Sequence, residues 1–190
     1  RCKMRWVKLI LMGLILLMLP MGLYAAQTAN ITVTVTVRYI SVAVSPNTYD
    51  FGFVDPGTYT TATSKIDVTN DGNDAEDFKL QITSSPSWTV EETSADPGNE
   101  EYKLLGLFNS SAPGDIYVGD APAEGTDDII FESSQKNCNT TNFAGDQNGD
   151  NVPSGATRNL WFRFGAPSST AVTTQQSIVV TVSAYKSTEF

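Results

Sequence analysis

The chain contains no histidine among its 190 residues. That absence excludes Ser-His-Asp and Cys-His catalysis, acid–base work by imidazole, and zinc held by histidine. The glycines form neither a phosphate-binding loop nor a dinucleotide-binding fingerprint. The 21 acidic residues always offer some carboxylate pair for glycoside hydrolysis. They gather, however, in turn sequences such as 71–77 and 127–128, which is typical of a solvated acidic rim. We therefore predict that the protein is not an enzyme.

Cysteine is nearly absent, with one residue at Cys2 and one at Cys138. If the first residues are removed on export, Cys138 has no partner for an intrachain disulfide. A lone thiol in an exported protein is either buried and inert or joins two chains. Burial is the simpler alternative, although the polar residues on both sides of Cys138 argue against it. With no base to activate it, Cys138 is not a persuasive nucleophile.

Long hydrophobic runs are also missing, except for residues 9–19 near the N-terminus. A basic stretch at 4–8 precedes this run, and Ala25 and Ala26 follow it, which is the pattern of a secretory signal peptide. The run is shorter than the roughly 20 residues of a membrane helix. We expect cleavage after Ala25 or Ala26, and we expect the natural start to be Met4. The alternative is that residues 1–26 remain as a membrane anchor.

Positive charge is scarce after this leader, where 8 basic residues face 21 acidic ones, for a net charge of −13. Such a surface repels nucleic acid and anionic membranes, because phosphate binding requires Lys and Arg. It favours solubility and attracts divalent cations. The charge balance therefore predicts no nucleic-acid partner and, after cleavage, no membrane partner.

One loop carries a pattern suited to a cation. Asp146, Asn148 and Asp150 place oxygen ligands at alternate positions of a polar turn, as calcium loops do. The pattern departs from an EF-hand, because Asn151 stands at the sixth position and the closing Glu is missing. Calcium is the one cofactor that the sequence admits, and the alternative is a turn with no ligand.

Three sequons are candidates for glycosylation if the organism has the machinery, or they arise by chance in a chain rich in Thr and Ser. They begin at Asn30, Asn109 and Asn139.

After the leader, short runs of alternating apolar and polar residues are separated by turn sequences such as 55–57 and 70–73. Alternation is the mark of a strand with one buried face. Residues 109–155 are polar and turn-rich, and loops of this length are either functional or mobile. The pattern predicts an all-β fold, an immunoglobulin-like or jelly-roll β-sandwich with an N-terminal extension strand. Strands are expected near 30–37, 40–45, 62–69, 78–82, 88–90, 102–108, 128–131, 157–164 and 177–185.

Two segments carry a resemblance that supports this fold. Residues 50–57 read Asp-Phe-Gly-Phe-Val-Asp-Pro-Gly, and residues 66–73 read Ile-Asp-Val-Thr-Asn-Asp-Gly-Asn. Together they resemble exported immunoglobulin-like domains with the pattern DFG-x-V-x-x-G followed by V-T-N-x-G-N. The two segments lie within residues 50–73, about one eighth of the chain, and the resemblance concerns the fold, not the function.

The segment directly behind the leader is the most informative for function. Residues 30–37 alternate without interruption, with Ile31, Val33, Val35 and Val37 on one face. At Tyr39 the phase changes, and a one-residue slip turns every side chain to the opposite face. Either a bulge lies there, or residues 30–37 and 40–45 are two strands in two different cores. An exposed apolar strand of this kind is normally protected by pairing with another strand, and one such partner is the sheet of a second copy.

This layout is similar to that of camelysin-type biofilm-fibre subunits, archaeal bundling pili and cannula tube proteins. The resemblance implies an extracellular, cell-surface filament built from copies of one subunit by donor-strand addition, with host or community surfaces as further partners. The corresponding division is a signal peptide at 1–26, a donor strand at 27–38 and a sandwich domain at 39–190.

Three alternatives stay open at this point. Residues 30–37 can be the first strand of their own sandwich. The protein can be a secreted module that binds carbohydrate or a surface, with an exposed Trp88 or Trp161 as a stacking platform, although their strand-like context favours packing in the core. It can also be a pilin-like subunit that retains residues 4–26 as a helix.

Overall fold

The computed structural model describes residues 28–85, 87–119 and 125–187. Every regular element within these residues is a β-strand, which confirms the all-β prediction. No helix in the described part of the chain is long and apolar enough to span a membrane. The chain divides into two units, Arg1–Thr36 and Val37–Phe190, and all of the strands belong to the second. The expected signal peptide at 1–26 lies outside the described residues.

The larger of two sheets has the strand order β1-β3-β8-β6-β5, and a short strand, β2, pairs with β8 beyond the end of β3. All of its pairs are antiparallel except β5 with β6. Its strands are β1 (Val42–Ser45), β2 (Tyr59–Thr61), β3 (Ile66–Asn70), β5 (Thr89–Val90), β6 (Glu101–Phe108) and β8 (Thr157–Gly165).

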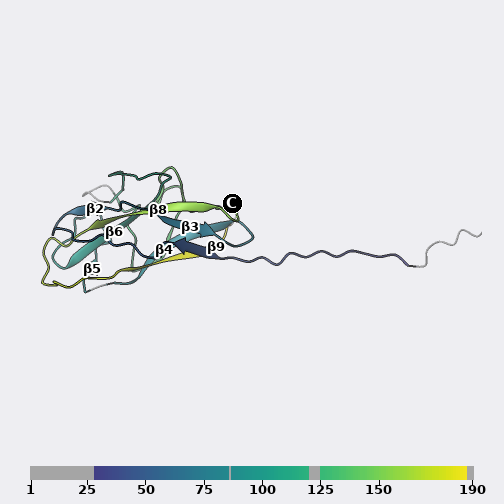
Figure 1. Ribbon diagram of the computed structural model, residues 1–190, viewed down its shortest axis with the longest axis horizontal. Helices are drawn as coiled ribbons and strands as arrows, with labels where there is room; N and C mark the ends of the chain where they lie inside the picture. The colour runs from purple at the N-terminus through teal and green to yellow at the C-terminus, as the bar shows by residue number, and fades with distance from the viewer. Residues whose placement is uncertain (1–27, 86, 120–124, 188–190) are drawn as a thin grey trace, which may run out of the picture. The chain divides into compact units, whose positions relative to one another are not determined.

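The smaller sheet has the order β7-β4-β9 and is antiparallel throughout. Its strands are β4 (Glu76–Ser84), β7 (Lys136–Asn137) and β9 (Val179–Lys186). Figure 1 shows β4 and β9 running together, apart from the β6 and β8 pair of the larger sheet. The domain is thus a β-sandwich, in which both sheets bury one face against the other.

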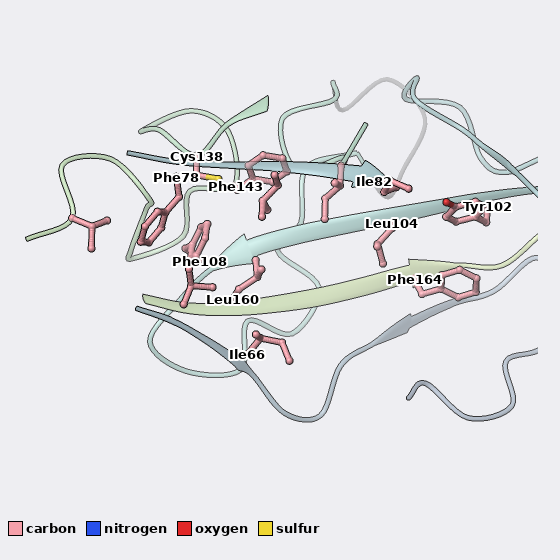
Figure 2. Close-up of a cluster of buried hydrophobic side chains, with 14 of the residues drawn as sticks. Ile66, Phe78, Ile82, Tyr102, Leu104, Phe108, Cys138, Phe143, Leu160 and Phe164 are labelled. Atoms are coloured by element: carbon pink, nitrogen blue, oxygen red, sulfur yellow. The ribbon is translucent and has the colours of Figure 1, made fainter. Parts of the chain in front are cut away.

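The main core fills the space between the two sheets. Residues at alternate positions of β4, namely Phe78, Leu80 and Ile82, are at most 1% exposed, and they pack with side chains from β3, β6 and β8. Figure 2 shows this arrangement, with Leu104 and Phe108 on β6 between the β4 residues and those of β8. The alternation read from the sequence is therefore the alternation that forms the core.

A second cluster covers the opposite face of β6 and β8. Leu105, Leu107 and Trp161 point to that face and pack with Tyr117 and Ile129 from the long segment 109–155. Residues 128–131 form an isolated bridge at Ile129 and Leu105 instead of the expected strand. The segment 109–155, expected to be a functional or mobile loop, thus includes a structural cover for the sheet.

Candidate functional site

The arm, residues 30–37, is the most exposed apolar segment of the described chain. Ile31, Val33, Val35 and Val37 have side chains that are 88%, 85%, 86% and 78% exposed. No strand is assigned anywhere from residue 28 to residue 41, so the expected strand at 30–37 has no pairing partner among the described residues. Four β-branched residues in water are a large apolar surface that protein association would cover.

The base of the arm is held by the turn between β3 and β4. Asn73 donates its side-chain amide to the Val37 carbonyl, at 2.8 Å, and accepts the Tyr39 N–H through Oδ1, at 2.8 Å. The Asn73 N–H donates to the Tyr39 carbonyl at 3.0 Å, and the Asp71 N–H donates to the Ser41 carbonyl at 3.1 Å. Arg38 forms an ion pair with Asp74. Residues 37–41 therefore extend β1 in the N-terminal direction along this turn.

A buried carboxylate completes this anchor. Glu76 is 0% exposed and accepts the Ser41 N–H through Oε1 at 2.7 Å, while its buried Oε2 has no hydrogen-bond partner among the described residues. Burial raises the pKa of Glu76, with a smaller contribution from nearby Asp71 and Asp74. Gly72 is required here, because a Cβ would lie 2.5 Å from the Tyr39 carbonyl oxygen.

The acidic turns are therefore not simply a solvated rim, as the sequence suggested. Glu76 in the first turn is buried against Ser41, and Asp128 in the second is 2% exposed. Asp128 accepts the Val118 N–H through Oδ2 at 2.7 Å. Backbone N–H groups make burial of these carboxylates tolerable, because they replace the hydrogen bonds lost from water.

The proposed calcium ligands are engaged with three different partners. Asp146 accepts hydrogen bonds from the Ser110 N–H and hydroxyl. Asn148 Oδ1 accepts the Asp150 N–H at 3.1 Å, and Asp150 lies beside Asp77. Burial and the Asp77 carboxylate raise the pKa of Asp150. Within the described ranges, no group of three or more His, Cys, Asp or Glu side chains is placed to hold a metal ion.

The three sequons differ in accessibility. Asn30 is exposed and Asn139 is half-buried. Asn109 is 8% exposed, and its side chain donates to the Ser111 carbonyl and accepts the Asp146 N–H, at 2.9 and 2.8 Å. A glycan on Asn109 would have to displace this buried contact, whereas Asn30 lies open at the start of the arm.

Both described tryptophans pack into the sandwich. Trp161 is 7% exposed, and its indole N–H donates to the Asn109 carbonyl at 2.8 Å. Trp88 is half-buried against the core beside Phe164, and its indole N–H donates to Thr170 at 2.9 Å. The prediction that both rings pack in the core is confirmed, and neither forms the exposed platform that a carbohydrate module requires.

Cys138 is buried in the main core, at 1% exposure. Burial raises the pKa of its thiol, which suppresses the reactive thiolate. We therefore expect a thiol reagent such as Ellman's reagent to modify Cys138 only after the protein is denatured. Non-reducing electrophoresis should show no disulfide-linked dimer through Cys138, and a dimer that a reductant separates would contradict this.

No protein-family model, curated protein or solved structure matches the chain.

Proposed function

We propose that the protein is a non-enzymatic, extracellular structural subunit that polymerises into a filament or tube. Each copy inserts its N-terminal strand, within residues 27–38, into the sandwich of a neighbouring copy. The observation that carries the proposal is the arm itself: eight residues with perfect alternation whose apolar face is in water. The hydrogen bonds that hold residues 37–41 to Asn73 and Glu76 support it, because a force on the arm is then transmitted directly to the domain.

The energies are sufficient for a stable polymer. Burying four β-branched side chains contributes roughly 1.5–3 kcal/mol each, or about 6–12 kcal/mol before costs. Main-chain hydrogen bonds add about 0.5–1.5 kcal/mol each, and the ordering of the arm and the loss of free motion offset part of this sum. Donation from one copy to the next is heterologous and does not close by itself, so it produces an extended assembly.

The sequence pattern supports export and the surface location. A leader of signal-peptide type precedes the arm, and the remainder carries a strong negative charge. We also propose that the sandwich is of the immunoglobulin-like or jelly-roll type. A secreted carbohydrate module is less well supported, because Trp88 and Trp161 pack inside the domain. A pilin-like subunit depends on residues 4–26, and the intact mass of the native protein distinguishes it.

The test is to compare purified protein comprising residues 27–190 with a version that begins at Arg38, by negative-stain electron microscopy and light scattering. We expect filaments or tubes from the longer form and monomers from the shorter form. Before assembly, circular dichroism should be the same for both, because every strand in the described residues lies after residue 41. Monomers from both forms, or filaments from both, would overturn donation by the N-terminal strand.

A further inference from the structure

The free edge of β9 is the longest open strand edge in the described part of the sandwich. β9 has eight residues and pairs with β4 on one side, and no described strand pairs with its other side. The other terminal strands of the two sheets are shorter: β1 has four residues, and β5 and β7 have two each. An incoming strand therefore finds its longest row of backbone partners along β9.

The core is also incompletely covered along this edge. Val180, Val182 and Ala184 face the core opposite Ile82, Leu80 and Phe78 of β4, with which they are in register. The β4 residues are at most 1% exposed, whereas their β9 partners are only half-buried. The two strands differ in that β4 has a strand on each side. One more strand beside β9 would give its apolar side chains the same cover.

β9 lacks the features that normally protect an edge strand. Its sequence, Val-Val-Thr-Val-Ser-Ala-Tyr-Lys, contains no proline and has no charge before Lys186. Natural edges are usually blocked by charges, by proline or by a covering element. An unprotected edge of this length indicates that something pairs with it in the working protein.

We propose that the free edge of β9 is the acceptor for the arm of a second copy, an inference that rests on the proposed function. The arm and β9 are both eight residues long, about 26 Å when extended. Its four apolar side chains then enter the core beside Val180 and Val182, and its threonines stay in water. The arm carries no charge, so no carboxylate or ammonium group is buried on pairing.

The anchor at the base of the arm favours a second copy over the same chain. Residues 37–41 are fixed in line with β1 by Asn73, Asp71 and Glu76. A chain that returned to its own β9 would have to turn within residues 30–36, and a turn there would interrupt the alternation. A neighbouring copy receives all eight residues as one continuous strand.

Cysteine cross-linking identifies the acceptor edge. Thr34→Cys marks the polar face of the arm, and Thr181→Cys or Ser183→Cys marks the solvent face of β9, where Thr181 and Ser183 pair with Gln81 and Lys79. Facing residues in paired strands have Cβ atoms about 4.5–5.5 Å apart, within reach of a disulfide. The control acceptor is Ala43→Cys, on the exposed β1 strand.

The arm variant and an acceptor variant are prepared separately, mixed, assembled and oxidised. We expect disulfide-linked dimers with at least one of the β9 cysteines and not with the β1 control. Filaments that link through Ala43→Cys, or through neither strand, would overturn β9 as the acceptor and leave donor-strand assembly standing. Failure of the unaltered protein to assemble would instead refute the proposed function. A link that forms within one chain carrying both cysteines, and not between chains, would place the arm on its own domain.

Hydrogen exchange on the unaltered protein provides a measurement without substitutions. Amides on the free edge of β9 should exchange on the order of 100-fold more slowly in filaments than in the Arg38 version, because pairing adds hydrogen bonds. Amides of β6, which lies inside the larger sheet, should be unchanged and serve as the control. Unchanged exchange along β9 in filaments would overturn the proposal.

Discussion

Replacing Val33 and Val35 together with aspartate is expected to prevent assembly at concentrations where the unaltered protein forms filaments. Each substitution removes a valine whose burial contributes about 1.5–3 kcal/mol, and it places a carboxylate in an apolar site, which costs more. Because about 1.4 kcal/mol corresponds to a factor of ten, the concentration needed for half-assembly should rise by a factor of at least about 10²–10⁴. Sedimentation of polymer over a concentration series measures this shift.

The matched control is the pair Thr34→Asp and Thr36→Asp, which adds the same charge on the other face of the arm. These threonines remain in water in the assembled form, so we expect a change of about tenfold or less. The melting temperature of the domain should be the same in both variants, because all four positions precede the first strand of the described residues. An equal loss of assembly in both pairs would mean that charge, and not burial of the valine face, prevents polymerisation.

Much of the fold could be predicted from alternation. Phe78, Leu80 and Ile82 alternate with polar residues in the sequence, and the same residues form the buried face of β4. β2 and β7 were not predicted, because two or three residues are too few to establish a period. The apolar residues of 109–155, such as Tyr117 and Phe143, are separated by turns and have no period. Their burial is decided by packing against distant strands, which a local pattern does not reveal.

The anchor of the arm was not predicted for a related reason. The run 70–73 was correctly recognised as a turn, but its contacts with residues 37–41 join positions thirty or more residues apart. Glu76 was expected in solvent because acidic residues next to turns are usually exposed. One signal was present: Gly72 and Asn73 follow a strand that ends in Asn70, and such turns often bind backbone through Asn side chains. The partner of that turn could be identified only from the structure.

Stability is expected to fall as the pH rises from about 4 to about 7, because of Asp128. Burial raises the pKa of Asp128 from 3.8 to about 7, and the N–H groups of Val118 and Phe143 and the charge of Lys136 oppose the rise only in part. Between these two values the folded state holds a proton that the unfolded state has released. Unfolding therefore becomes easier with rising pH, by at most about 1.4 kcal/mol per pH unit.

The variant Asp128→Asn removes this titration, so its free energy of unfolding should fall less steeply with pH over that interval, by at most about 1.4 kcal/mol per pH unit. The slope is the quantity to compare, because an amide also loses one of the two backbone contacts and lowers stability at every pH. Asp146→Asn makes the same change of charge at an exposed site, where hydrogen bonds from Ser110 lower the pKa of the carboxyl. Removing the Asp146 carboxyl should therefore leave the fall in stability between pH 4 and 7 unchanged. Urea unfolding at pH 5, 6 and 7 distinguishes these cases, and an unchanged slope in Asp128→Asn would show that another group binds the proton.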